Sequence, residues 1–283
     1  MRRLRDRRNH PDCRGIALLL VLWLVALLAA TVGAFALSAR TEQLQGQVLA
    51  RGLEAHAAAR AGIEYAVARL MDARASEQDP RRRWIPDGRE YRWRFGDADL
   101  TLRIVDEQGK VDLDMADAGL IAALLRELGS EPREAQQVAG AIVDWRDADT
   151  LTQPGGGAEA ADYAAAGRDY GPANMPFESV AEVEQVLGMT PALYARLAPH
   201  VTVYSGRAVP DPAYASAPVR AATGLPATPA GPLAAGSGTY SIESRASIRG
   251  RAAVLRVVAR LGGNGLPGSA WTPLRWEEGT SPR

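Results

Sequence analysis

An uninterrupted apolar stretch from Ile16 to Leu37 follows directly on a basic N-terminal segment. A helix needs about 20 mostly apolar residues to cross the hydrocarbon core of a bilayer, whereas the apolar part of a secretory signal has only about 7 to 15. The pattern therefore predicts a transmembrane helix over residues 16–37. Small residues around Ala34 and Ala36 leave conventional signal cleavage behind this stretch as an alternative.

The helical pattern continues beyond the apolar stretch. Apolar residues recur at spacings near three, four and seven, which places them in one stripe on a helix, and no proline interrupts the pattern. We predict one helix from Ile16 to about Ala73, in which residues 38–75 continue outside the membrane and pack on a globular head. The stripe consists of Leu44, Val48, Ala55, Ala59, Ile63, Ala66 and Leu70.

Two later regions alternate apolar and polar residues with the period of two that is typical of β-strands. Each region, over residues 91–104 and 240–261, contains two such runs separated by a glycine-containing turn. A single two-stranded hairpin is at best marginally stable in water. We therefore predict that residues 84–111 and 238–278 combine into one antiparallel sheet.

The residues between the two strand regions have mostly helical patterns, with prolines at helix starts and a glycine at a helix end. The predicted fold class is α+β: a long N-terminal helix packs on the antiparallel sheet, and an all-α subdomain is inserted over residues 112–204. Residues 205–237, which are rich in Pro, Ala and Gly, are expected to form a connection. The predicted helices are Ala118–Leu128, Pro132–Trp145, Ser179–Leu187 and Pro191–Leu197.

The charge distribution predicts the topology. Residues 1–15 carry six arginines against two aspartates, so the positive-inside rule places them in the cytoplasm and the chain beyond Leu37 on the other side of the membrane. Because the whole chain has a formal net charge of zero, the remainder is acidic, which argues against a protein that binds nucleic acid through phosphate attraction. The only cysteine, Cys13, lies in the basic segment, which leaves packing or a metal to stabilise the rest.

The junction formed by the basic segment, Arg14, Gly15, Ile16 and the apolar residues that follow resembles a type IV prepilin signal. The resemblance implies that a prepilin peptidase removes residues 1–15 by cleaving after Gly15, so that the mature chain begins at Ile16 with a methylated N-terminus. In that family the fifth mature residue is usually a glutamate, which is thought to meet the N-terminal amine of a neighbouring subunit. This chain has Leu20 at that position.

Three further segments resemble the general secretion pathway protein K family of type II secretion minor pseudopilins, which also lacks that glutamate. The resemblance implies a pseudopilin fold and no enzymatic activity. It implies a subunit that initiates or caps the tip of the periplasmic pseudopilus, which drives export of folded proteins across the outer membrane. The implied location is the bacterial inner membrane, crossed once. The implied partners are other minor pseudopilins, the major pseudopilin and the prepilin peptidase, with secreted cargo and the outer-membrane secretin as further candidates. The segments are residues 106–114, 144–163 and 174–204.

Acidic residues gather around a run of three glycines, residues 155–157, and carboxylates on such a pliable loop repel one another unless a cation binds. Hard oxygen ligands suit calcium, and the resembled family is described as binding Ca2+ in this insertion. Helix caps and a solvated acidic loop are the alternative explanation, because the spacing is not that of an EF-hand. The preferred ligands are Asp147, Asp149, Glu159 and Asp162.

Other motifs leave few alternatives. The sequence contains no GxSxG, no P-loop and no GxGxxG that opens a helix, so no enzyme class is indicated. Residues 177–190 resemble a helix-hairpin-helix element, which makes a competence-type pseudopilin or DNA-binding membrane protein the alternative function. Few positive charges flank this element, so no nucleic acid is expected. A membrane sensor that keeps its leader is a further alternative.

Asp112, Asp114 and Asp117 form a second acidic cluster, in which Asp114 is predicted to cap the following helix.

Overall fold

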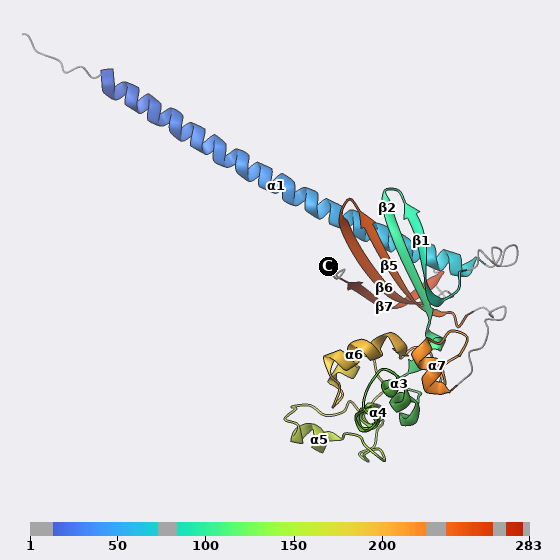
Figure 1. Cartoon of the computed structure of the whole chain (residues 1–283). Helices are drawn as coiled ribbons and strands as arrows, with labels where there is room; N and C mark the ends of the chain where they lie inside the picture. The colour runs from blue at the N-terminus through green and yellow to red at the C-terminus, as the bar shows by residue number, and fades with distance from the viewer. Residues whose placement is uncertain (1–13, 73–83, 225–235, 263–269, 280–283) are drawn as a thin grey trace, which may run out of the picture. The chain divides into compact units, whose positions relative to one another are not determined.

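The computed structural model describes residues 14–72, 84–224, 236–262 and 270–279 (Figure 1). Residues 1–13 of the predicted leader, 73–75 of the predicted helix, 225–235 of the predicted connection and 263–269 of the second predicted sheet segment lie outside these residues. Contacts divide the chain into two units, Met1–Glu54 and Ala55–Arg283. The second unit contains the sheet, the inserted helices and the last turns of the first helix.

Helix α1 (Arg14–Met71) is continuous over 58 residues, as the unbroken pattern predicts. It is long and apolar enough to cross a membrane by length and composition. Its described side chains are exposed as far as Glu54. From Ala55 onward the stripe residues Ala59, Ile63 and Ala66 are buried, so this part of the helix belongs to a core. The helix ends two residues before the predicted Ala73.

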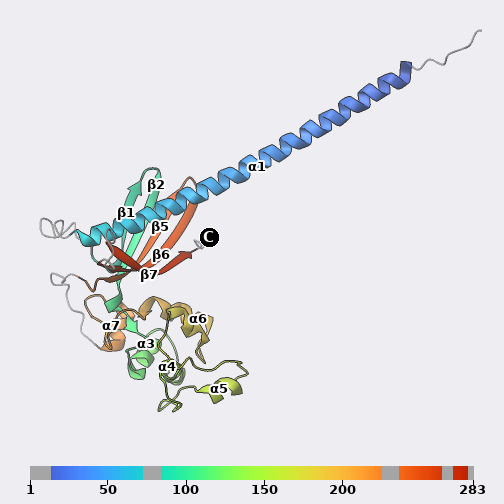
Figure 2. The ribbon, with the colours of Figure 1, turned by 180° about the vertical axis from the view of Figure 1, so that it is seen from behind.

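One antiparallel sheet has the strand order β1-β2-β5-β6-β7, and Figure 2 shows it from behind. Strands β2 and β5 are neighbours although more than 130 residues separate them, so the sheet is assembled from both predicted regions. Its inner face packs against residues 58–67 of α1. The strands are β1 (Asp87–Phe95), β2 (Ala98–Asp106), β5 (Thr239–Ile248), β6 (Arg251–Leu261) and β7 (Trp271–Gly279).

The opposite face of the sheet carries one row of alternating charge that crosses all five strands. Neighbours in the row are cross-strand partners, and opposite charges in such positions stabilise a sheet. Arg103 lies 3.0 Å from Glu90, and Arg256 lies 2.6 Å from Glu243. Burial raises the pKa of Glu243, but the guanidinium groups of Arg245 and Arg256 outweigh burial and hold that pKa below its usual value. The row is Glu90, Arg103, Glu243, Arg256 and Glu277.

The inserted helices have a core of their own, separate from that of the sheet. The insertion begins and returns at a short parallel pair, β3 (Val111–Asp112) and β4 (Val201–Thr202), which brings its two ends together. The remaining elements are α3 (Ala118–Glu127), α4 (Pro132–Arg146), α5 (Ala160–Ala165), α6 (Pro191–Leu197) and α7 (Ala217–Thr223), with 3-10 turns η2 (Glu107–Gly109), η3 (Val180–Gln185) and η4 (Ala198–His200).

Two parts of the insertion differ from the expectation. The segment predicted as a helix over Ser179–Leu187 is the six-residue 3-10 turn η3. Two of its six residues are valines, whose β-branched side chains disfavour an α-helix. Helix α7 lies within the region expected to be a connection. Its Val219 is fully buried in the helical core, so the packing of the insertion extends beyond residue 204.

Candidate functional site

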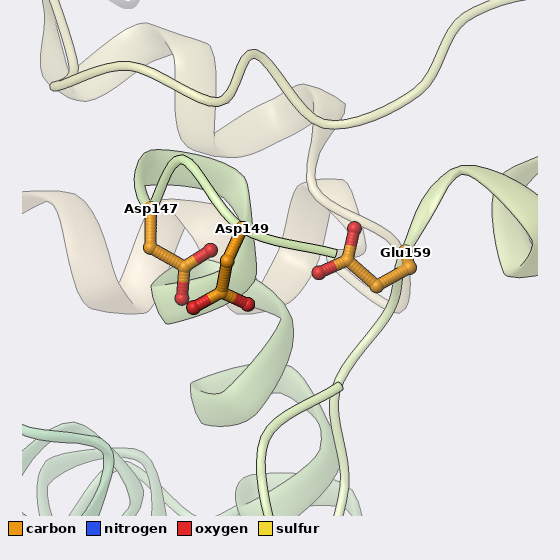
Figure 3. Close-up of side chains that lie close together, drawn as sticks. All are labelled: Asp147, Asp149 and Glu159. Atoms are coloured by element: carbon orange, nitrogen blue, oxygen red, sulfur yellow. The ribbon is translucent and has the colours of Figure 1, made fainter. Parts of the chain in front are cut away.

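Three of the four predicted metal ligands lie together. Asp147 and Asp149 follow the end of α4, and Glu159 directly precedes α5. One carboxylate oxygen from each lies within 4.8 Å of the others. Figure 3 shows the Glu159 side chain pointing toward the two aspartates from the opposite side of the loop. Residues up to twelve apart in sequence thus present a compact set of hard oxygen atoms, which is the donor chemistry of a calcium site.

The loop is held against α4 by a close backbone approach and by a buried aspartate. A side chain at Gly140, in the middle of α4, would overlap the carbonyl oxygen of Gly156. Asp144 is fully buried, and its carboxylate accepts hydrogen bonds from the backbone N–H groups of Gln153 at 3.1 Å and Ala158 at 2.8 Å. Asp144 therefore fixes the loop on both sides of the glycine run.

The described residues satisfy the carboxylates only in part: the N–H of Leu151 donates to Asp149, and the side-chain amide of Gln153 donates to Asp147. One oxygen each of Asp147 and Glu159 is buried without a hydrogen-bond partner in the described part of the chain. Burial raises the pKa of both groups, and the neighbouring negative charges raise it further. The adjacent Arg146 donates to the backbone carbonyls of Leu113 and Ala116. Buried, unpaired oxygen atoms beside like charges fit a bound cation.

Asp162, the fourth predicted ligand, is held in a different role. Its Oδ2 accepts a hydrogen bond of 2.9 Å from the backbone N–H of Glu159 at the start of α5. This contact is the capping interaction expected three residues into a helix. Asp162 therefore orients the residue that carries the third carboxylate, and the three-carboxylate group comprises only Asp147, Asp149 and Glu159.

The second acidic cluster is used for hydrogen bonds within the fold. The prediction that Asp114 caps the following helix is wrong, because Asp117 accepts the capping hydrogen bond from Leu120 at 2.7 Å. Asp114 accepts instead from the backbone N–H of Phe177. Asp112 accepts from the backbone N–H groups of residues 205 and 206, shortly after β4. Asp112 and Asp114 thus tie segments that are distant in sequence, whereas Asp117 acts locally.

The hairpin-like element packs into the helical core. Val183, Val186 and Leu193, which flank the turn at Gly188, are buried there. Thr190 caps α6 by accepting a hydrogen bond from the N–H of Leu193. These apolar side chains and the capping threonine therefore have structural roles.

The predicted processing site lies at the beginning of α1. Gly15 and Ile16 are in its first turn, and the Leu20 side chain is exposed one turn further along. An apolar residue therefore occupies the position at which the resembled prepilins usually carry a glutamate.

Comparison with known proteins identifies the family. Residues 101–206 match the family model described as "Type II secretion system (T2SS), protein K". The type II secretion system protein K of Klebsiella pneumoniae is 33% identical over 213 residues, which cover 68% of this chain and 63% of that protein. The chain belongs to the type II secretion system protein K family. The protein K of Pectobacterium carotovorum subsp. carotovorum is 29% identical over 211 residues, covering 66% of this chain and 62% of the relative. The chain thus matches less than two thirds of the length of these two relatives.

A solved structure has the same fold. A chain of the crystal structure of the GspK-GspI-GspJ complex from the enterotoxigenic Escherichia coli type 2 secretion system matches with a TM-score of 0.56 and 16% identity, covering 86% of this chain and 99% of that chain. The predicted α+β class, with a long apolar helix, an antiparallel sheet and an inserted helical region, is confirmed.

Proposed function

We propose that the protein is a minor pseudopilin of type II secretion that initiates or caps the tip of the periplasmic pseudopilus. The observation that carries this proposal is the combination of a 58-residue helix, exposed over its described N-terminal part, with a head whose sheet is interrupted by a large helical insertion. The apolar part of the helix serves as an inner-membrane anchor and then packs against other subunits. Assembly, not catalysis, is the proposed activity.

The arginine-rich leader stays in the cytoplasm and the head lies in the periplasm, according to the positive-inside rule. Prepilin peptidase cleaves after Gly15, and the new N-terminus at Ile16 is methylated. The protein is thereby released from its leader while α1 remains in the bilayer, ready for transfer into a growing filament.

Other minor pseudopilins and the major pseudopilin are the proposed partners. The similar E. coli chain comes from a complex that contains GspK, GspI and GspJ, which supports the first class of partner. A terminal place in the filament follows from the insertion, because a bulky subdomain is hard to repeat along a slim fibre. Secreted cargo and the outer-membrane secretin are proposed contacts of the exposed tip.

N-terminal sequencing of the native protein, combined with secretion by a strain that lacks the gene, tests this function. The expected first residue is Ile16, and the deletion strain is expected to lose secretion until the gene is restored. A native chain that still starts at Met1, or unchanged secretion without the gene, contradicts the proposal. A salt-dependent DNA mobility shift with the full chain would favour the DNA-binding alternative instead.

Replacing Leu20 by glutamate is expected to reduce incorporation into the pseudopilus tip. A tip subunit has no neighbour ahead whose amine the new carboxylate can meet, and an unpaired charge in lipid costs about 2.5 to 3.5 kcal/mol at the centre of a helix and less toward its ends. Co-purification of the mature protein with the other minor pseudopilins measures the effect. Leu20→Gln, which is polar but uncharged, is expected to assemble better, and equal incorporation of Leu20→Glu and wild type contradicts the argument.

We also propose that the three carboxylates hold a structural calcium ion. Asp147, Asp149 and Glu159 supply the protein oxygens. The ion offsets the repulsion between these carboxylates and contacts the buried oxygens of Asp147 and Glu159 that accept no hydrogen bond from the described residues. The ion would hold the loop between Asp149 and Glu159 closed. Because the only cysteine lies in the leader, this contact takes the place that a disulfide has in other exported proteins.

Calcium is expected to raise the thermal stability of the full chain in detergent micelles. A free calcium concentration of 100 times the dissociation constant stabilises the bound form by about 2.7 kcal/mol. The double variant Asp147→Asn/Glu159→Gln is expected to lose the calcium-dependent rise in Tm, while Asp169→Asn, an exposed acidic residue of the same insertion, retains it. The variant Asp162→Asn decides whether a fourth carboxylate binds. An unchanged Tm with calcium contradicts the site.

The pH dependence of the calcium-free protein provides a second readout. The pKa values of Asp147 and Glu159 in the folded protein lie above their ordinary values of 3.8 and 4.5. Ionisation of these groups therefore destabilises the fold at neutral pH, and this destabilisation is relieved as the pH falls through the raised pKa values. In EDTA, we expect the double variant to be more stable than wild type at pH 7, with the difference shrinking as the pH falls toward 4.5.

A further inference from the structure

The outer edge of strand β1 is open. In the sheet order β1-β2-β5-β6-β7, β1 pairs only with β2, and no other described strand lies on its far side. Its nine residues, Asp87–Phe95, contain no proline. Such an edge presents unpaired N–H and C=O groups to which a further strand can add. Edge strand β7, by contrast, contains Pro273.

The side chains of β1 alternate strictly along its second half. Arg92 and Arg94 are opposite Thr101 and Asp99 on the face that carries the charged row. Arg94 has only a long contact of 3.7 Å with Asp99, in which both side chains are more than 70% exposed. Arg92 has no ion-pair or hydrogen-bond partner among the described residues. Two arginine side chains two residues apart are thus available to a strand that adds at this edge.

The other face of β1 ends in aromatic rings. Trp93 stacks on Tyr65 of α1 with ring centroids 4.1 Å apart, and Tyr91 stacks on Trp84 at 4.2 Å. Phe95 continues the series next to Trp93 and is half exposed. The rings therefore extend the apolar inner face up to the open edge, where apolar side chains of a further strand can pack beside them.

We propose that β1 binds an extended acidic segment of a partner protein by strand addition. The segment carries carboxylates at alternate positions facing Arg92 and Arg94, and aliphatic or aromatic residues between them facing Trp93 and Phe95. On this edge the charged row ends at Glu90. The segment therefore carries a basic residue at the alternate position that faces Glu90. This proposal deepens the proposed function by naming the chemistry of one partner, but binding by the purified chain tests it independently of secretion.

A second copy of this chain fits the edge less well. The charged row ends in Glu90 on β1 and in Glu277 on β7. Addition of a second copy through β7, with the row continued across the junction, would place these two glutamates side by side, and like charges in opposite positions destabilise a sheet. Nucleic acid also fits poorly, because the stacked rings of Trp93 and Trp84 already have an aromatic partner on one face.

The test uses fluorescent nine-residue peptides and the full chain in detergent micelles. The first peptide alternates valine with two glutamates and a lysine in the order that matches Arg94, Arg92 and Glu90. The second has lysine for glutamate and glutamate for lysine. The third keeps the first sequence but has N-methyl groups on the amides that would face β1. We expect the first peptide to bind, and the second and third to bind at least about tenfold more weakly, because they lose the charge match or the strand hydrogen bonds.

Two variants locate the binding. Arg92→Glu/Arg94→Glu is expected to weaken the first peptide at least about tenfold, whereas Arg126→Glu/Arg251→Glu makes the same change of net charge at exposed positions away from this edge and leaves binding intact. Hydrogen exchange of residues 87–95 is expected to slow when the first peptide binds. Equal binding of the N-methylated peptide indicates attraction of charge alone and overturns the proposal, as do displacement by DNA at equal affinity, absence of binding, or protection elsewhere on the chain.

Discussion

Replacing Gly15 by valine is expected to leave the protein as a full-length precursor and to abolish its part in secretion. Gly15 lies in the first turn of α1, directly before the residue at which the mature chain is proposed to begin. A peptidase that cuts after glycine must accommodate this residue in its active site, and a β-branched side chain adds bulk there and is restricted in rotation. Mass spectrometry of the membrane fraction distinguishes the precursor from a chain that starts at Ile16.

Gly33→Val is the matched control for this substitution. Gly33 lies in the same helix, and a side chain built on it meets no atom within 4 Å. This variant carries the same glycine-to-valine change inside the apolar segment, and it is expected to be cut normally. Normal processing of Gly15→Val contradicts the proposed cleavage site, and failure of both variants indicates an effect on membrane insertion instead.

The elements that could be predicted from the sequence are those with a long, regular period. Helix α1 carries one apolar stripe over many turns, and β2 and β5 alternate cleanly because one face of each is buried. Pairing of the two distant regions followed from the instability of isolated hairpins. These arguments depend on the burial of one whole face of a helix or strand, because such burial makes apolar residues recur at a regular spacing in the sequence.

Elements without such a repeat could not be found. Strand β7 contains Pro273, and its register against β6 shifts at that point, so its alternation is broken and no separate strand was predicted. Helix α7 has seven residues in a region rich in Pro, Ala and Gly. Its signals were Pro218 in the first turn and Gly224 as a left-handed C-cap, which favour a short helix at those places. Both signals are local, and the high content of Pro, Ala and Gly in this region favoured the prediction of a connection instead.

The candidate site was predictable in its chemistry and not in its geometry. The carboxylates and the glycine run are visible in the sequence, and three of the four residues chosen come together. The capping contact of Asp162 at the start of α5 had no distinct signal in the sequence, because an aspartate near a loop can serve as a cap or as a ligand. Asp117 has the capping role that was expected of Asp114. The two residues are about one helical turn apart, and the spacing of apolar residues does not decide at which of them the helix begins. The close approach of the Gly156 carbonyl to Gly140 could not be predicted, because its only trace in the sequence is a glycine within a helical pattern.

Replacing Gly140 by alanine is expected to destabilise the insertion by about 2 to 3 kcal/mol or more and to remove the calcium response. Alanine favours a helix over glycine by about 1 kcal/mol, but its side chain would overlap the Gly156 carbonyl, a backbone atom that cannot rotate away. Forced overpacking in a core costs about 1 to 3 kcal/mol even where side chains can adjust. The loop must therefore leave α4, which separates Asp147 and Asp149 from Glu159. Thermal unfolding with and without calcium measures both effects.

Gly46→Ala serves as the control, since it makes the same substitution in a helix where nothing lies within 4 Å of the added atom. This variant is expected to keep or slightly raise stability, as helix propensity alone predicts, and to keep the calcium response. The two consequences at Gly140 are separable: a loss of stability with an intact calcium response would show that the carboxylates stay together without the contact on α4. Wild-type stability of Gly140→Ala would show that the loop is not pressed against this helix, and the structural basis of the site would then be wrong.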